Sequence, residues 1–214
     1  MLIPSLVGGM PDWDRLRAIA DRHGLKIIED SCDTLGGHYR GRPAGERSDI
    51  SVTSFSIFHI ITCLGNGGLV AINDPKLWDR ALMLRAWGRS SEKFMHGTRQ
   101  GDSDGRFLED LGDIAYDAMF IFEELGYGFI PNQAGAAFGH EQLNKLDMFT
   151  QLRQERFELH GAYMDKHADV FIKAKVHPDV FTTWICYPVQ LRPELGWSRR
   201  ALQMHLEGNG IFTR

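Results

Sequence analysis

Cysteine is scarce in this chain, and its thiols form no ligand pattern. The 214 residues include three cysteines, Cys32, Cys63 and Cys186, and no two of them form a CxxC pair. An odd and scattered set is typical of reduced thiols in a cytoplasmic protein rather than of a disulfide framework. The nine histidines also lack the HExxH spacing of a zinc site. We therefore expect a cytoplasmic protein with no bound metal.

Long apolar runs and an excess of charge of one sign are also missing. No apolar run approaches the roughly 20 residues that a membrane-spanning helix needs, and the first residues lack the pattern of a signal peptide. The 24 basic and 28 acidic residues are mixed along the chain and give a formal net charge of -4. Binding of nucleic acid would require a basic surface. We therefore expect neither a membrane span nor a nucleic-acid partner.

Short catalytic fingerprints are absent as well. The chain contains no GxSxG motif, and its Gly-Asn-Gly-Gly stretch at residues 65–68 lacks the spacing of the known phosphate-binding loops. This stretch precedes an apolar run typical of a strand, whereas a phosphate loop opens a helix. The pattern therefore favours a tight turn over a phosphate site.

What the chain does contain is an alternation of strand and helix patterns. Residues 2–7 and 25–29 are apolar runs typical of buried strands, and the helical pattern between them begins at Pro11-Asp12 and ends at Gly24. A strand–helix–strand series with short loops predicts a parallel sheet. Residues 50–58 and 69–72 predict two further strands.

The middle of the chain combines polar segments with one helix. Residues 36–49 predict a loop or hairpin, and Asp74-Pro75 begins a helix that runs to about Trp87. Residues 88–115 are polar and nearly aperiodic. Loops of that length in compact domains are usually functional or mobile.

The last third of the chain changes to longer helices. Helical patterns cover residues 135–146 and, past a bend, 149–167, and a last helix covers residues 198–209. Short strands are predicted within residues 181–189. We expect a domain boundary near residue 150, which divides the chain into residues 1–150 and 151–214.

Three polar residues lie where ligands bind in such a sheet. Asp30 ends a predicted buried strand, and ligands of open parallel sheets bind beyond the carboxyl ends of the strands. Ser54 and His59 share one strand-to-loop segment, in which a hydroxyl can bind phosphate and an imidazole can move a proton near neutral pH. Taken singly, such residues more often have structural roles, Asp30 as a cap and His59 as an ordinary histidine. The residues alone therefore leave the function open.

Three segments together resemble one family of enzymes. They are residues 28–33 (IEDSCD), residues 54–59 (SFSIFH) with the glycine turn at 65–68, and residues 125–127 (LGY) followed by 133–137 (QAGAA). Their order and spacing are similar to those of the DegT/DnrJ/EryC1/StrS family, whose members use pyridoxal phosphate and act on nucleotide-linked keto sugars. The resemblance implies an α/β, aspartate-aminotransferase-like fold (fold type I). It would comprise part of the large domain, with its parallel or mixed sheet, and part of a small α+β domain.

The resemblance also implies roles for individual residues. Asp30 would pair with the pyridine nitrogen of pyridoxal phosphate, Asp33 would be a further cofactor-binding residue, and Ser54 would bind the cofactor phosphate. Arg214 would contact the substrate. His59 stands where ordinary members of the family have the lysine that binds the cofactor covalently.

A histidine at that position resembles the 3-dehydratase subgroup of the family. These enzymes use pyridoxamine phosphate to remove the 3-hydroxyl of a 4-keto-6-deoxy sugar nucleotide, and His59 would be the base. One branch of the subgroup holds an iron–sulfur cluster by four cysteines, of which only Cys32 has a counterpart here. The resemblance therefore points to the cluster-free branch, which acts in surface-polysaccharide biosynthesis.

The same resemblance implies partners and leaves alternatives open. The expected partners are a nucleotide-linked keto sugar, glutamate as amino donor and a second subunit of a homodimer. The first alternative is a pyridoxal-phosphate-dependent sugar aminotransferase, in which Lys93 or Lys145 would supply the missing amine. The second is a non-catalytic member of the family, because the chain resembles a fragment without the family's Gly-Thr phosphate loop.

Overall fold

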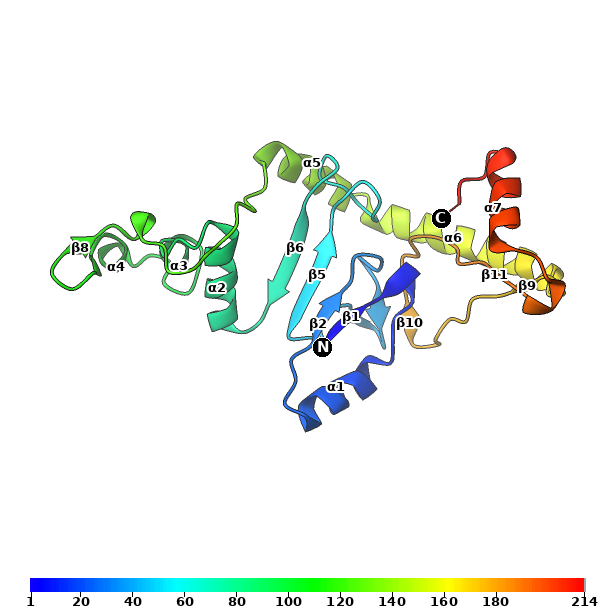
Figure 1. Cartoon of the computed structure of the whole chain (residues 1–214), viewed down its shortest axis with the longest axis horizontal. Coiled ribbons are helices and arrows are strands. Elements are labelled where there is room, and N and C mark those ends of the chain that lie inside the picture. Colours follow the sequence, from blue (N-terminus) through cyan, green and yellow to red (C-terminus); the bar gives the residue numbers. More distant parts are fainter. Residues whose placement is uncertain (214) are drawn as a thin grey trace.

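A four-stranded mixed sheet lies at the centre of the chain (Figure 1). The computed structural model describes residues 1–213, so the predicted substrate-binding residue Arg214 lies outside the described residues. The strands β1 (Leu2–Pro4), β2 (Ile28–Asp30) and β5 (Ile50–Ser54) are parallel. The fourth strand, β6 (Gly68–Ile72), pairs with β5 in antiparallel register. The predicted parallel sheet is thus confirmed for three strands, and β6 reverses because no helical crossover separates it from β5.

The helix α1 (Trp13–Arg22) follows the predicted pattern closely. The Asp12 carboxylate caps its first turn by accepting the backbone N–H of Arg15 at 3.1 Å. After the helix ends, Gly24 adopts a left-handed φ of +61° that favours glycine. Both helix ends were therefore encoded by local residues.

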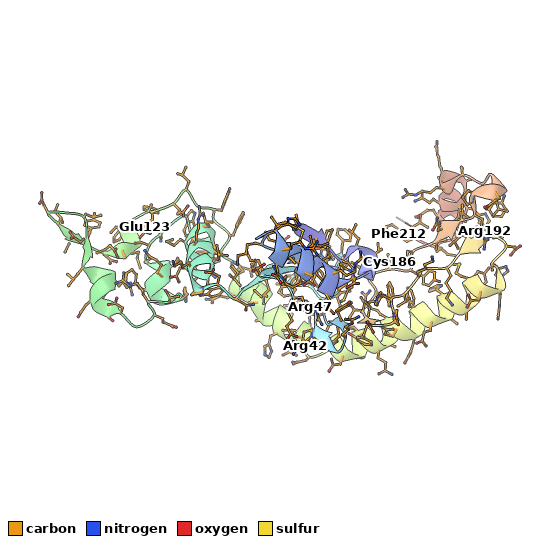
Figure 2. All side chains as sticks on the ribbon, turned by 90° about the horizontal axis from the view of Figure 1, so that it is seen from below. Arg42, Arg47, Glu123, Cys186, Arg192 and Phe212 are labelled. Carbon is orange, nitrogen blue, oxygen red and sulfur yellow. The ribbon has the colours of Figure 1, made fainter. Side chains whose placement is uncertain are left out.

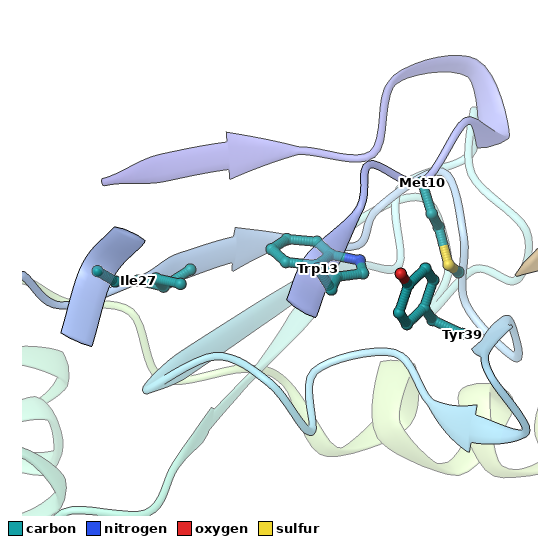
Figure 3. Packing of buried hydrophobic residues seen from close by; sticks show 5 residues of the cluster. Met10, Trp13, Ile27 and Tyr39 are labelled. Carbon is teal, nitrogen blue, oxygen red and sulfur yellow. The ribbon is translucent and has the colours of Figure 1, made fainter. Parts of the chain in front are cut away.

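A small apolar core joins α1 to the sheet (Figure 3). Trp13, which is 2% exposed, lies in this core with Met10, Ile27 and Tyr39. Tyr39 comes from a hairpin of β3 (His38–Tyr39) and β4 (Arg42–Pro43), which confirms the hairpin expected within residues 36–49. The Tyr39 hydroxyl donates to Asp12 at 3.1 Å, so the hairpin is tied to the start of the helix.

Two predicted strands were too long at their carboxyl ends. The first ends at Pro4 instead of residue 7, because the chain bends into a 3₁₀ turn, η1 (Leu6–Gly8). The strand predicted at residues 50–58 ends at Ser54, since the chain then turns towards His59. In both places the apolar pattern continues into a loop, and periodicity alone does not mark the turn.

An arm extends from the central sheet beyond α2 (Pro75–Arg85), which begins at the predicted Asp74-Pro75 cap. We define the arm as residues 88–130. In Figure 2 its Glu123 lies at the opposite end of the elongated molecule from Arg192. The segment 88–115, predicted as a loop, contains α3 (Glu92–Met95), α4 (Ser103–Phe107), β7 (Glu109–Asp110) and the start of β8 (Ala115–Tyr116), and η2 (Ala118–Phe120) follows it.

Two helices lead from the arm to the C-terminal part. The helices α5 (Gln133–Leu143) and α6 (Leu146–Lys166) confirm the predicted pair with a bend between them. The predicted boundary near residue 150 falls inside α6 and stays a prediction. Within residues 1–213, no helix has both the length and the apolar composition needed to cross a bilayer.

Of the strands predicted within residues 181–189, the described residues show one strand that ends at Phe181. The rest of this segment packs back on α6. Phe157 stacks on Trp184 with ring centroids 3.8 Å apart, and Arg153 donates to the Trp184 carbonyl at 2.9 Å. Side-chain contacts with α6, and not backbone pairing with another strand, thus hold the residues around Trp184. The elements present are β9 (Phe171–Ile172), β10 (Val180–Phe181), β11 (Gln190–Leu191), η3 (Pro193–Leu195) and the predicted last helix α7 (Arg199–Gly208).

Asp49 ties the amino end of β2 to α1. Its carboxylate accepts the backbone N–H of Ile27 at 2.8 Å and pairs with Arg17 and Lys26 at 3.0 Å each. The Ile27 N–H, aided by the two cations, lowers the pKa of Asp49 to about 2. The charged carboxylate is therefore the form that stabilises the fold.

We expect Asp49→Asn to lower the free energy of unfolding at pH 7 by about 1–3 kcal/mol, because charge-assisted hydrogen bonds are lost. The pKa of Asp49 is lowered by folding, so its contribution is present above about pH 4 and is lost as the pH falls towards 2. The difference from wild type should shrink over that range in urea unfolding followed by circular dichroism. Asp21→Asn is the control, because Asp21 also pairs with Arg17 but its side chain is 66% exposed, against 21% for Asp49. An equal loss in both variants would contradict this account.

Glu29, in the middle of β2, has the opposite electrostatic environment. Its side chain is almost completely buried, and burial raises its pKa to about 7 despite a hydrogen bond from the Gly45 N–H at 2.8 Å. The folded chain thus holds a proton on Glu29 at pH values where the unfolded chain has released it. Stability from this proton is present below about pH 4.5 and declines as the pH rises through 7.

Glu29→Gln should therefore raise the free energy of unfolding at pH 8, by on the order of 2–3 kcal/mol. The neutral amide keeps an oxygen for the Gly45 N–H and removes the cost of burying a charge. At pH 4 the two proteins should differ little. Chemical unfolding at pH 4, 6 and 8 measures the trend, and a gap that does not grow with pH would show that Glu29 does not titrate in this range.

Candidate active site

The candidate residues gather at the carboxyl edge of the sheet. Asp30 is the last residue of β2 and pairs in register with Val52 of the parallel strand β5. Ser54 ends β5 two residues further on, so both side chains lie at the same edge. Both residues are half-buried. The structure therefore brings together the two residues predicted to hold a ring nitrogen and a phosphate.

The thiol of Cys32 lies among the predicted cofactor residues. Burial raises its pKa to about 12, helped by a hydrogen bond to Asp30 and by the negative charges of Asp30 and Asp33, while the Ser54 backbone opposes the rise. Cys32 also donates its backbone N–H to the Asp30 carboxylate at 3.1 Å. A thiol with so high a pKa is neutral at pH 7 and a poor nucleophile, and Cys32 contributes hydrogen bonds to Asp30. The sequence had suggested only its match to a cluster ligand.

His59 lies beside Asp33, one turn after β5. Its Nδ1 is hydrogen-bonded to Ser56 Oγ at 2.8 Å, and its Nε2 lies 3.8 Å from Asp33 Oδ1. The imidazole is 24% exposed, so one side of it is open. When the Nδ1 proton is donated to Ser56, Nε2 is the basic nitrogen, and Asp33 can stabilise the cation that forms on protonation. This pair can therefore take up and return a proton.

The loop after β1 positions Asp33. The backbone N–H of Val7 donates to Asp33 Oδ2 at 2.9 Å. Val7 has a φ of +51°, a left-handed conformation that is strained for a β-branched residue. Such strain is often stored at functional sites. Nothing in the sequence pattern marked Val7, because the contact uses only its backbone.

Lys93 and Lys145 were considered as sources of the amine that position 59 lacks, but both lie outside the candidate site. Lys93 lies in α3 of the arm and forms an ion pair with Glu123 at 2.6 Å. Lys145 precedes α6 and is exposed. Neither residue belongs to the cluster of Asp30, Asp33 and His59. No set of His, Cys, Asp and Glu side chains within residues 1–213 is arranged to hold a metal ion.

A groove of about 490 Å³ opens on one side of His59. Its walls come from the loop after β5 and from α5 and α6, and they include Arg153 and Arg156. These two arginines and Ser56 are among the polar residues that the sequence reasoning did not single out. Ser56 could have been noticed, because it lies three residues before His59, but the arginines lie about a hundred residues away in sequence.

Comparison with known proteins gives relatives along the whole chain. It is 31% identical over 206 residues to dTDP-4-dehydro-2,6-dideoxy-D-glucose 3-dehydratase of Saccharopolyspora spinosa, covering 94% of this chain and 43% of that protein. It is 28% identical over 216 residues to the lipopolysaccharide biosynthesis protein RfbH of Salmonella typhimurium, covering 100% of this chain and 49% of that protein. The chain thus spans about half the length of the curated relatives that it matches.

Solved structures confirm the predicted fold class. The structure of the E. coli GDP-4-keto-6-deoxy-D-mannose-3-dehydratase with bound hydrated PLP superposes with a TM-score of 0.80 at 22% identity, covering 100% of this chain and 52% of that one. At this identity the likeness concerns the fold, which is that of the aminotransferase-like enzymes of fold type I. Residues 1–214 also match the DegT/DnrJ/EryC1/StrS aminotransferase family as a whole. The chain therefore belongs to this family.

Proposed function

We propose that this chain carries part of the active site of a nucleotide-sugar 3-dehydratase that uses pyridoxal phosphate and pyridoxamine phosphate. The observation that carries the proposal is His59, which the resemblance assigns to the family's lysine position and which lies 2.8 Å from Ser56 and 3.8 Å from Asp33. An imidazole cannot form the stable covalent link that a lysine amine forms with the cofactor. It can still move a proton, which is what removal of a hydroxyl requires.

The edge residues fit the cofactor chemically. The half-buried Asp30 carboxylate is oriented by the Cys32 N–H and suits a protonated pyridine nitrogen. The Ser54 hydroxyl accepts the Ser56 N–H at 3.2 Å and keeps its own proton for a phosphate oxygen. Pyridoxal phosphate held in this way supplies an electron sink.

His59 would be the acid and base of the reaction. Its Nε2 would take up one proton and return a proton to the departing C3 hydroxyl. Asp33 would stabilise the imidazolium between these two events, and the hydrogen bond to Ser56 would hold the ring in one orientation. Asp33 thus acts on the cofactor through His59.

The proposed partners follow from the family and from the surface. A relative named as a 3-dehydratase of a dTDP-linked sugar supports a nucleotide-linked keto sugar as substrate, and RfbH supports a place in lipopolysaccharide biosynthesis. Glutamate as amino donor and the cytoplasm as location belong to the same proposal. A homodimer would cover the apolar side chains that the arm exposes, among them Phe122, Leu125 and Phe129.

The deciding assay mixes the purified chain with pyridoxamine phosphate and a 4-keto-6-deoxy sugar nucleotide and follows the mass of the sugar product. We expect a product in which hydrogen replaces the C3 hydroxyl, because His59 can move protons but cannot bind the cofactor covalently. A product aminated at C4 would instead support the aminotransferase alternative. Absence of both products and of cofactor binding would support a non-catalytic member.

His59→Lys should convert the site to that of an ordinary family member. We expect this variant to be labelled covalently by pyridoxal phosphate, seen as a gain in mass after borohydride reduction, and to lose C3 deoxygenation. His59→Asn is the matched control, because it removes the base without adding an amine and should show neither labelling nor deoxygenation. Unchanged deoxygenation in either variant would remove His59 from the mechanism.

A further inference from the structure

The groove beside His59 is shared by two parts of the chain that are distant in sequence. One wall is the loop after β5, and the other is formed by α5 and α6, which pass alongside that end of the sheet (Figure 1). Its volume of about 490 Å³ lies within the range of small-molecule sites. Because His59 belongs to its lining, a ligand in the groove would reach the candidate site.

The groove is lined by basic side chains and by no acidic one. Arg153 and Arg156 project from α6 and His59 from the loop, and no Asp or Glu belongs to the lining. The arginines are three residues apart on one helix, a spacing at which like charges face each other and destabilise the helix. A bound anion would remove this repulsion.

Neither arginine forms an ion pair with an Asp or Glu within residues 1–213. Arg153 donates to the carbonyls of Trp184 and Ile185 at 2.9 and 3.3 Å, and burial lowers its pKa. The exposed Arg156 has no hydrogen bond or ion pair in the described part of the chain. The Arg153 guanidinium is thus fixed by backbone carbonyls, whereas the Arg156 guanidinium can move to contact a ligand. Two guanidinium groups, each with several N–H donors, suit the oxygens of a phosphate or pyrophosphate.

We propose that this groove binds the pyrophosphate of a nucleoside diphosphate, with Arg156 and Arg153 as its ligands and Phe149 and Leu152 as an apolar wall for the nucleoside. The inference rests on the proposed function, in which the sugar is nucleotide-linked. It adds a place for the nucleotide: the anion binds on α6, and the attached sugar points towards His59. Arg156 would be the main anion-binding contact, because within residues 1–213 it has no other partner.

The test measures binding of GDP, dTDP and inorganic pyrophosphate to the purified chain by titration calorimetry, without cofactor. We expect Arg156→Gln to weaken binding of all three roughly tenfold, as expected for loss of one charge-assisted contact, and added salt to weaken wild-type binding. Arg156→Lys should recover part of the affinity. Arg200→Gln is the matched control, since Arg200 is an exposed arginine of α7 outside the groove. Circular dichroism checks that each variant is folded.

Three results would overturn the assignment. They are no binding by the folded wild-type chain, equal binding by Arg156→Gln, and an equal loss in Arg200→Gln, which would indicate attraction by net charge alone. Because no cofactor is present, failure here is distinct from failure of the proposed reaction. Anion binding without C3 deoxygenation would support the anion site in the groove and contradict the proposed dehydratase activity. C3 deoxygenation with no effect of Arg156→Gln on anion binding would support the dehydratase activity and contradict the anion site.

Discussion

The parallel pairing of β2 with β5 is the constraint on which the candidate site depends. Backbone hydrogen bonds hold it at both ends: Ser31 donates to the Val52 carbonyl at 2.8 Å, and Ile50 donates to the Ile27 carbonyl at 3.1 Å. In this register Asp30 and Ser54 end their strands at one edge of the sheet. A shift by one residue would turn each side chain to the opposite face. The site therefore exists only as long as this register does.

Glu29 and Asp30 are neighbours on β2, and they differ in burial and therefore in what they can do. Glu29 is enclosed, and its pKa is raised to about 7, so it favours the neutral form. Asp30 lies at the half-buried edge, where the Cys32 N–H donates to its carboxylate. Neighbours in sequence thus differ in burial because alternate residues of a strand face different surroundings. The carboxylate that remains available to a ligand is the one at the edge.

The proposed proton movement and the proposed anion binding are divided between two parts of the chain. The loop after β5 supplies His59, whose orientation comes from Ser56 and whose neighbour is Asp33. The helix α6 supplies arginines, one of which also fastens the segment after the helix through the Trp184 carbonyl. The packing that stabilises the C-terminal part therefore also shapes the groove beside His59.

Local sequence determined the elements whose signals are local. The Asp12 and Asp74 caps, the glycine at position 24, and the position of Asp30 at the end of its strand followed from spacing and residue type, and three motifs together, one of them around His59, identified the family. Tertiary structure decided what depends on distant partners: the end of β1 at Pro4, the Val7 contact with Asp33, and the meeting of Arg153 with the loop of His59. The physical reason is that periodicity reports which face of an element is buried, whereas backbone contacts and charges brought together from distant segments leave no periodic trace.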